Sequence, residues 1–144
     1  MSMNEMVTMA PIGYLRTEAQ DIPRHWTLSD VEGTIIIDKA YVEGLVNITP
    51  GQKITVLFWF HKSPKFSSRF LRQTPPHRKE DLGVFSICSP RRPNPIGLSV
   101  LTVLDIHQGM IHVKGVDMLD GTPILDIKPY ITSKENCPSY KEKT

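Results

Sequence analysis

Short runs rich in β-branched and aromatic residues recur along this chain and leave little room for helix. They predict strands over 12–18, 32–38, 54–60, 83–88, 98–106, 110–119 and 124–131, separated by turn residues, with one short helix within 39–48. Six or seven strands with so little helix favour a barrel or closed sheet, because closure removes exposed strand edges. The sequence therefore predicts an all-β fold.

One of these runs, "ITVLFWF" at 54–60, is apolar almost throughout and lacks the alternation of a half-solvated strand. We therefore expect both of its faces to be covered, and in a single-sheet protein the second cover is a partner subunit. Phe58 and Trp59 fit a core better than a base-stacking platform, since stacking aromatics usually lie on an exposed strand face.

Length and composition exclude several classes of protein. The 144 residues suit one domain, and no apolar run approaches the roughly 18 residues that cross a bilayer. The first residues lack the basic start and apolar stretch of a signal peptide, so we expect a soluble, cytoplasmic protein with no membrane partner. Cys88 and Cys137 lie at no disulfide or zinc-ligand spacing, so we expect neither a disulfide nor a metal.

Charge is distributed unevenly along the chain. Residues 61–92 hold eight Lys/Arg against two Asp/Glu, whereas the rest holds nine Lys/Arg against 13 Asp/Glu. This asymmetry indicates a surface that receives an anion, with nucleic acid as the large candidate. The alternative is a solvated loop whose charges serve solubility.

Two proline-rich segments interrupt the strand pattern. Residues 61–83 contain three prolines and are too long for an ordinary connection, which is typical of a functional or disordered loop. The segment "SPRRPNPIG" at 89–97 is stiffened by Pro90, Pro93 and Pro95, and it can present Arg92 to a phosphate or carboxylate. Its alternative is a rigid barrel corner whose arginines pair with local acids.

Two further short motifs admit a functional and a purely structural interpretation. "DGTP" at 120–123 is a typical turn that could also supply a carboxylate and close backbone approach, and His61-Lys62 is either a strand end or the rim of a pocket. No G-x-S-x-G, P-loop, dinucleotide fingerprint or H-E-x-x-H occurs, so hydrolase and classical nucleotide-binding functions have little support.

"GVFSICSPRRPNPIGLSV" followed by "VKGVDMLDGTPILDIKPY" resembles the TsaA-like family of tRNA adenine-N6 methyltransferases, also called the TrmO family, in a short single-domain form. The resemblance implies a single-sheeted six-stranded antiparallel β-barrel with a short helix and long loops, which forms a homodimer. It also implies an N-terminal extension at 1–11, a barrel domain at 12–131 and a tail at 132–144. The implied donor is S-adenosylmethionine, and the implied acceptor is the N6 atom of threonylcarbamoyladenosine at position 37 of tRNA.

The resemblance also implies which residues form the site. Cys88 stands where the family usually has an arginine, and a thiol cannot replace a guanidinium, so Arg91 or Arg92 covers that contact or the cofactor binds differently. The implied cofactor-binding residues are Pro23, Arg24, His25, His61, Lys62, Cys88, Arg92, Leu98, Asp120, Gly121, Thr122 and Pro123.

A threonylcarbamoylated N6 atom is a poor nucleophile until it loses its proton, so a base must assist, and Asp120, His61 and Tyr130 are the hypotheses. A methyltransferase of small molecules and a non-catalytic barrel that binds S-adenosylmethionine or RNA stay open as alternatives. RNA contact is expected from Arg69, Arg72, Arg78, Lys79 and Arg91.

Overall fold

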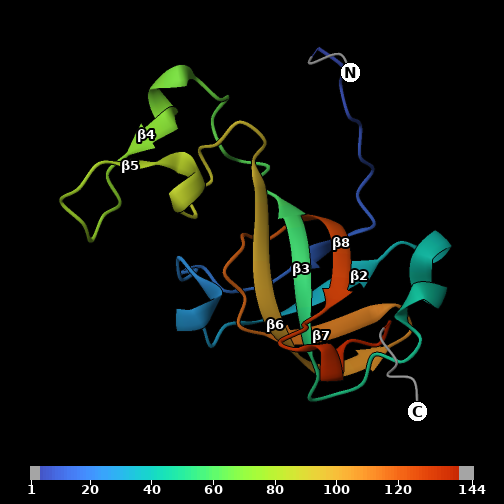
Figure 1. Cartoon of the computed structure of the whole chain (residues 1–144). Coiled ribbons are helices and arrows are strands. Elements are labelled where there is room, and N and C mark those ends of the chain that lie inside the picture. The colour runs from blue at the N-terminus through green and yellow to red at the C-terminus, as the bar shows by residue number, and fades with distance from the viewer. Residues whose placement is uncertain (1–3, 140–144) are drawn as a thin grey trace.

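A computed structural model describes residues 4–139, and its centre is a closed barrel of six strands (Figure 1). Neighbouring strands are antiparallel throughout, in the order β1-β2-β7-β6-β3-β8, with β8 closing onto β1. The predicted all-β barrel is confirmed. The barrel strands are β1 (Gly13–Arg16), β2 (Glu32–Ile37), β3 (Lys53–Trp59), β6 (Ile96–His107), β7 (Met110–Lys114) and β8 (Pro123–Pro129).

Along β2, β3 and β7 alternate residues point inward, and the core contains aliphatic side chains and one aromatic ring. Ile54, Val56 and Phe58 of β3 are 1%, 0% and 2% exposed. This period of two is the signature of a strand with one face in the core. The remaining core members come from the other five strands and the segment after β7: Leu15, Ile35, Ile37, Leu101, Val103, Ile111, Val113, Val116, Met118 and Ile124.

The outer face of β3 is only partly covered by the described residues 4–139. Leu57 is half-buried and Trp59 is 45% exposed, so the burial of β3 alternates although its sequence does not. The prediction that Trp59 belongs to the core is wrong, whereas that for Phe58 is confirmed. A run of apolar residues cannot by itself show what packs against the outer face of the strand.

All helical segments among residues 4–139 are of the 3-10 type. The predicted helix after β2 is η2, in which Asp38 accepts a hydrogen bond from the Ala40 amide at 3.0 Å as its N-cap. Repeated β-branched residues and a glycine disfavour a longer α-helix there. The five segments are η1 (Trp26–Leu28), η2 (Lys39–Leu45), η3 (Ser68–Leu71), η4 (Val84–Ser86) and η5 (Lys134–Asn136).

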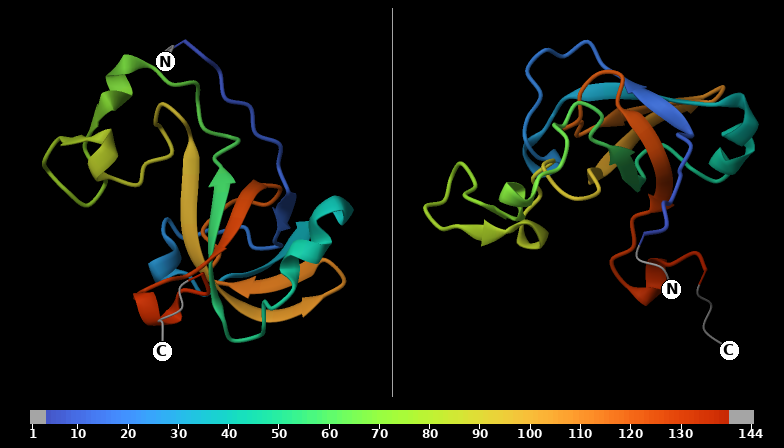
Figure 2. Two further views of the ribbon diagram at one scale, coloured as in Figure 1. Left: turned by 45° about the vertical axis from the view of Figure 1, so that its right-hand side comes forward. Right: turned by 90° about the horizontal axis from the view of Figure 1, so that it is seen from above.

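Residues 61–95 form an arm that stands away from the barrel (Figures 1 and 2). The arm contains η3, η4 and a small sheet of β4 (Arg72–Gln73) and β5 (Leu82–Gly83). The strand predicted over 83–88 is therefore wrong: after the two residues of β5 the chain turns into η4, with Val84 buried and Phe85 78% exposed. With only a two-residue partner, β-propensity alone does not maintain a strand.

Two predicted segments in the C-terminal half differ from the structure in detail. β7 is shorter than the predicted strand, because the chain leaves the sheet after Lys114. η5 carries a capping box between Ser133 and Asn136, within the segment expected to be a tail. Residues 1–3 of the expected N-terminal extension and 140–144 of the expected tail lie outside the described residues. Within 4–139, no helix has the length and apolarity of a membrane span.

Gly97 of β6 provides a test of barrel packing. It lies opposite Phe58 of β3, and an added Cβ would overlap the buried Phe58 ring. We expect Gly97→Ala to lower the free energy of unfolding by about 1–3 kcal/mol through overpacking. Urea denaturation measures this change.

Gly83→Ala is the matched control, because Gly83 has φ −64° and no atom within 4 Å of a new Cβ. We expect this variant to be stabilised by about 0.4–1 kcal/mol, since alanine restricts the unfolded chain. Equal effects of the two substitutions would contradict the packing described for Gly97.

Candidate functional site

The antiparallel register brings three of the connections between barrel strands to one end of the barrel. Trp59 at the end of β3 pairs with Ile96 at the start of β6, and Phe58 pairs with Ile124 near the start of β8. Likewise, the end of β7 pairs with the start of β2, and β1 ends beside them. We call this end, where β1, β3 and β7 stop and β2, β6 and β8 begin, the barrel mouth.

Most residues of the predicted cofactor site lie at the barrel mouth or on the arm beside it. Those of 23–25 follow β1, those of 61–62 follow β3, and those of 120–123 precede β8. Leu98 differs, since it lies in β6 opposite Leu57, on the outer barrel wall, and is 53% exposed. The sequence-based grouping of these loops thus corresponds to one end of the fold.

The proline-arginine loop at 89–95 is fixed by hydrogen bonds from neighbouring segments. The Phe60 amide donates to the Pro95 carbonyl at 2.8 Å, and the Ser63 hydroxyl donates to the Pro90 carbonyl at 3.0 Å. The Gln73 amide donates to the Arg91 carbonyl at 2.7 Å. These contacts, with three fixed proline φ angles, give the loop a preset shape.

Arg92 lies next to Cys88, the position where the resemblance implies an arginine. Its Nη1 atom donates to the carbonyls of Ile87 and Ser89 at 3.0 and 3.1 Å, so the guanidinium spans both peptide neighbours of the exposed Cys88. Arg91 instead stacks over the Phe70 ring at 5.5 Å. Of the two arginines, Arg92 is the one placed to supply a guanidinium at position 88.

The "DGTP" turn joins the mouth to the end of β1. Asp120 accepts a hydrogen bond from the Thr17 amide at 2.9 Å, and Gly121, at φ +82°, donates its amide to the Leu15 carbonyl at 2.8 Å. Thr122 is buried and donates to the Leu119 carbonyl at 2.6 Å. No atom lies within 4 Å of the position that a Cβ would take at Gly121, so the backbone there is open to a ligand.

The loop before η1 connects the barrel to the arm. The Nδ1 atom of His25 accepts from the Thr27 amide at 3.3 Å and so caps η1, while its ring stacks against Trp26 at 5.2 Å. Arg24 Nη1 lies 3.4 Å from Nε2 of His77 on the arm. Arg24 thus lies against the arm, and His25 is bonded to η1.

The three base hypotheses fall in different places. His61 follows β3 at the mouth, with its ring 6.4 Å from that of Trp59. Asp120 is engaged in the turn described above. Tyr130 follows β8 at the opposite end, where Lys53 at the start of β3 lies 6.0 Å from its ring, so the seven residues of β3, about 20 Å, separate it from the mouth.

The expected RNA-binding residues all lie on the arm, but two of them have acidic partners. Arg72 pairs with Asp81 at 2.9 Å, and Arg78 lies 3.9 Å from Glu80, both at exposed sites. Arg69 and Arg91 flank the Phe70 ring, at 4.7 and 5.5 Å. The arm presents a cationic surface that the two acids neutralise in part.

Asp117 is a site residue that the sequence analysis missed. It accepts a hydrogen bond from the fully buried Ser99 at 2.5 Å. Burial raises the pKa of the Asp117 carboxyl, against the opposing effects of the Ser99 hydroxyl, the His25 charge and the Trp26 amide. A signal was present in the sequence: Asp117 is the one acid in the otherwise apolar stretch 116–119.

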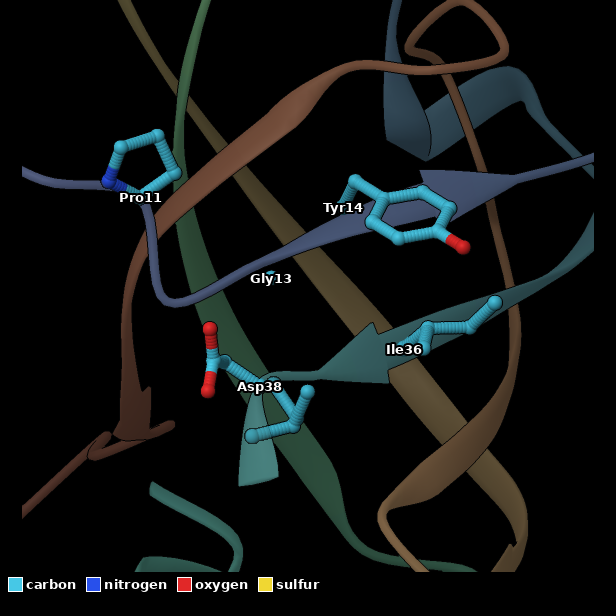
Figure 3. Close-up of a pocket in the computed structure, with 6 residues that line it drawn as sticks. Pro11, Gly13, Tyr14, Ile36 and Asp38 are labelled. Carbon is cyan, nitrogen blue, oxygen red and sulfur yellow. The ribbon is translucent and has the colours of Figure 1, made fainter. Parts of the chain in front are cut away.

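A shallow hollow of about 260 Å³ lies on the outer wall, away from the mouth (Figure 3). Pro11, Gly13, Tyr14, Ile36 and Asp38 line it, at the start of β1 and the end of β2. None of the predicted site residues borders this hollow.

Fold and site together define a class of protein: a closed antiparallel barrel that gathers its polar groups in loops at one end and carries a cationic arm beside them. Residues 14–136 match the family model described as the tRNA-methyltransferase O N-terminal domain. The chain belongs to this family, as the motifs around 83–100 and 113–130 predicted.

Three relatives illustrate the match. An S-adenosyl-L-methionine-binding protein of Archaeoglobus fulgidus is 38% identical over 125 residues, which cover 85% of this chain and 88% of the relative. A human tRNA (adenine(37)-N6)-methyltransferase is 39% identical over 98 residues, 68% of this chain and 22% of that protein. The crystal structure of TrmO from Pseudomonas aeruginosa superposes with a TM-score of 0.73 and 31% identity, over 95% of this chain and 61% of that one.

Proposed function

We propose that this protein is an S-adenosylmethionine-dependent methyltransferase that acts in the cytoplasm on N6 of threonylcarbamoyladenosine at position 37 of tRNA. The observation that carries the proposal is the meeting of a rigid polar mouth with a cationic arm on one barrel. Membership of the methyltransferase family supports the activity. The name of the Archaeoglobus fulgidus relative supports the donor, and that of the human relative supports the acceptor.

The groups at the mouth fit the donor. Lys62 and the Arg92 guanidinium offer cations for its carboxylate, and the open turn at Gly121 permits close backbone approach. Carbonyl oxygens and carboxylates at the mouth suit a cationic sulfonium. When bound, S-adenosylmethionine supplies an electrophilic methyl group, and the chain's task is to hold donor and acceptor in line, an effect worth up to about 7–11 kcal/mol.

The arm fits an RNA acceptor. It joins the proline-arginine loop through Gln73 and the 23–25 loop through His77, so a polyanion held on the arm lies next to the mouth. Arg69, Lys79 and Arg91 have no acidic partner within the described ion pairs, and they extend the cationic surface beyond Arg72 and Arg78. Position 37 would then enter the mouth while flanking phosphates contact the arm.

We also propose a homodimer through the outer wall of β3 and β6. Trp59, Ile96 and Leu98 are 45%, 39% and 53% exposed on these two paired strands, and they give the outer wall an apolar surface next to the barrel mouth. A second copy is the occupant that the uncovered face of β3 favours, since its sequence is apolar on both sides. The partner would then border the site.

Incubation with labelled S-adenosylmethionine and tRNA that lacks the methyl group tests the proposed function. We expect label on N6-methylated threonylcarbamoyladenosine when digested nucleosides are analysed by mass spectrometry. The matched control is tRNA that carries unmodified adenosine at position 37. Donor binding without transfer to either tRNA would favour a small-molecule acceptor, and no donor binding would favour a non-catalytic RNA-binding barrel.

Arg92 and Cys88 allow a test of the donor site. We expect Arg92→Ala to weaken S-adenosylmethionine binding about 10- to 100-fold, the effect of losing a hydrogen bond to a charged group. Arg92→Lys should not restore binding, because an ammonium lacks the planar fork, whereas adding Cys88→Arg to Arg92→Ala should restore part of it. Calorimetry measures the affinities.

Arg78→Ala, on the arm, is the matched control for donor affinity and should leave it unchanged. Wild-type donor affinity in Arg92→Ala would show that the guanidinium beside Cys88 makes no contact with the donor.

Salt dependence tests the arm as the RNA surface. We expect the logarithm of the tRNA association constant to fall linearly with the logarithm of salt, and each of Arg69→Ala and Lys79→Ala to reduce the slope by about 0.7–0.9. Lys39→Ala, on η2 at the other end of the barrel, should leave the slope unchanged. Slopes that are equal in all variants would remove the arm from the RNA interface.

A further inference from the structure

β6 continues past the point where its neighbour β7 ends. β6 runs from Ile96 to His107, but its register with β7 begins only at Thr102, opposite Lys114. On that side, the first half of β6 is faced by the segment 115–118 and by η1. This segment is joined to the residues after η1, because the Gly115 amide donates to the Val31 carbonyl and the Ser29 hydroxyl donates to the Val116 carbonyl. The parting of β6 and β7 leaves a gap in the strand pairing of the barrel at the mouth.

Asp117 occupies this gap. Its Oδ1 atom accepts from the Ser99 hydroxyl at 2.5 Å, and it lies between the buried Val116 and Met118 without being fully buried itself. The His25 charge and the Trp26 backbone both lower the pKa of this carboxyl, against the raising effect of burial. A carboxylate that is fixed by a hydroxyl donor and only partly buried is an arrangement suited to receive a proton.

We propose that Asp117 is the general base of the methyl transfer, held in place by Ser99 as a positioning residue. This inference rests on the proposed function. Asp117 accepts the N6 proton while the nitrogen lone pair forms the bond to the methyl carbon; the bond between that carbon and sulfur breaks, with its electron pair remaining on sulfur. A sulfonium and a carboxylate thus give a thioether and a carboxylic acid, and charge balances.

The alternatives are less well placed for this role. Asp120 accepts the Thr17 amide and holds the turn, and Tyr130 lies at the opposite end of the barrel. His61 packs against Trp59 on the outer wall of β3. Asp117 is an acid at the mouth whose pKa is raised by burial. This shift moves the pKa of Asp117 toward neutral pH, where a proton acceptor works best.

The charged groups around Asp117 set the direction of its pH response. From the loop before η1, His25 faces it; beyond, Asp30 pairs with Lys114 at 4.0 Å in an exposed position, and Asp120 is bound to Thr17. The base must be ionised, so the transfer rate should rise with pH through the raised pKa of Asp117 and then level off. The Ser99 hydrogen bond lowers that pKa, so its loss should move the rise in transfer rate to higher pH.

The test compares Asp117→Asn, Ser99→Ala and the matched control Asp105→Asn, an exposed acid of β6 away from the mouth. Single-turnover transfer to the tRNA at saturating donor is measured across pH, with donor affinity and the carboxyl titration of the ligand-free protein followed by NMR. We expect Asp117→Asn to slow transfer at saturating donor by about 100- to 10,000-fold, with a much smaller loss of donor affinity. Asp105→Asn should behave as wild type.

Ser99→Ala should shift the kinetic midpoint and the NMR midpoint of Asp117 upward together, a readout that a purely structural role would not move. This variant also carries the test if Asp117→Asn does not fold. Retained transfer in Asp117→Asn, a loss of donor affinity as large as the loss of transfer, or midpoints that fail to shift would overturn the proposal. A wild-type protein without activity on the tRNA would overturn the proposed function and this step together, whereas an active wild type with an active Asp117→Asn overturns this step alone.

Discussion

Closure of the barrel between β1 and β8 is the constraint on which the mouth depends. The two strands share only two registered pairs, Gly13 with Ile124 and Tyr14 with Pro123. Backbone bonds from Leu15 to Thr122 and from Gly121 to Leu15 extend this seam, and the Asp120 carboxylate closes it on the Thr17 amide. The "DGTP" turn is therefore part of the barrel wall, and a turn that completes a closed sheet is held rigidly enough to form one side of a binding site.

The same closure explains why the polar groups gather where they do. A six-stranded barrel has a side-chain-filled interior, as the buried aliphatic residues here confirm, so a ligand site can form only on its wall or at its ends. At the mouth, β6 extends beyond the end of β7, so the first residues of β6 have no strand partner on that side. This stretch of β6 needs polar partners in place of a neighbouring strand. Ser99 lies in that stretch and Asp117 lies in the segment bonded to it, so a discontinuity of the sheet, rather than a sequence motif, determines their position.

The sequence predicted most of this fold because strands with a buried face repeat every two residues, and six of the seven expected strands are barrel strands. It failed over 83–88, where "GVFSIC" has the composition of a strand but lacks a long partner, and at Trp59, whose exposure depends on what packs outside the barrel. Among site residues, the motif-bearing loops were found. Asp117 was not, because its proposed role arises from the hydrogen bond to Ser99 and the charge of His25, which lie 18 and 92 residues away in the chain.

The proposed base and the proposed donor influence each other through charge. Burial raises the pKa of the Asp117 carboxyl, and a cation placed nearby opposes that effect, because it stabilises the ionised form that accepts a proton. A sulfonium bound at the mouth would be such a cation, so donor binding would lower the pKa of Asp117. Linkage requires the converse: the ionised form of Asp117 would bind the sulfonium more tightly than the protonated form does. Transfer turns the sulfonium into a neutral thioether and Asp117 into a carboxylic acid, so this attraction is lost as the product forms.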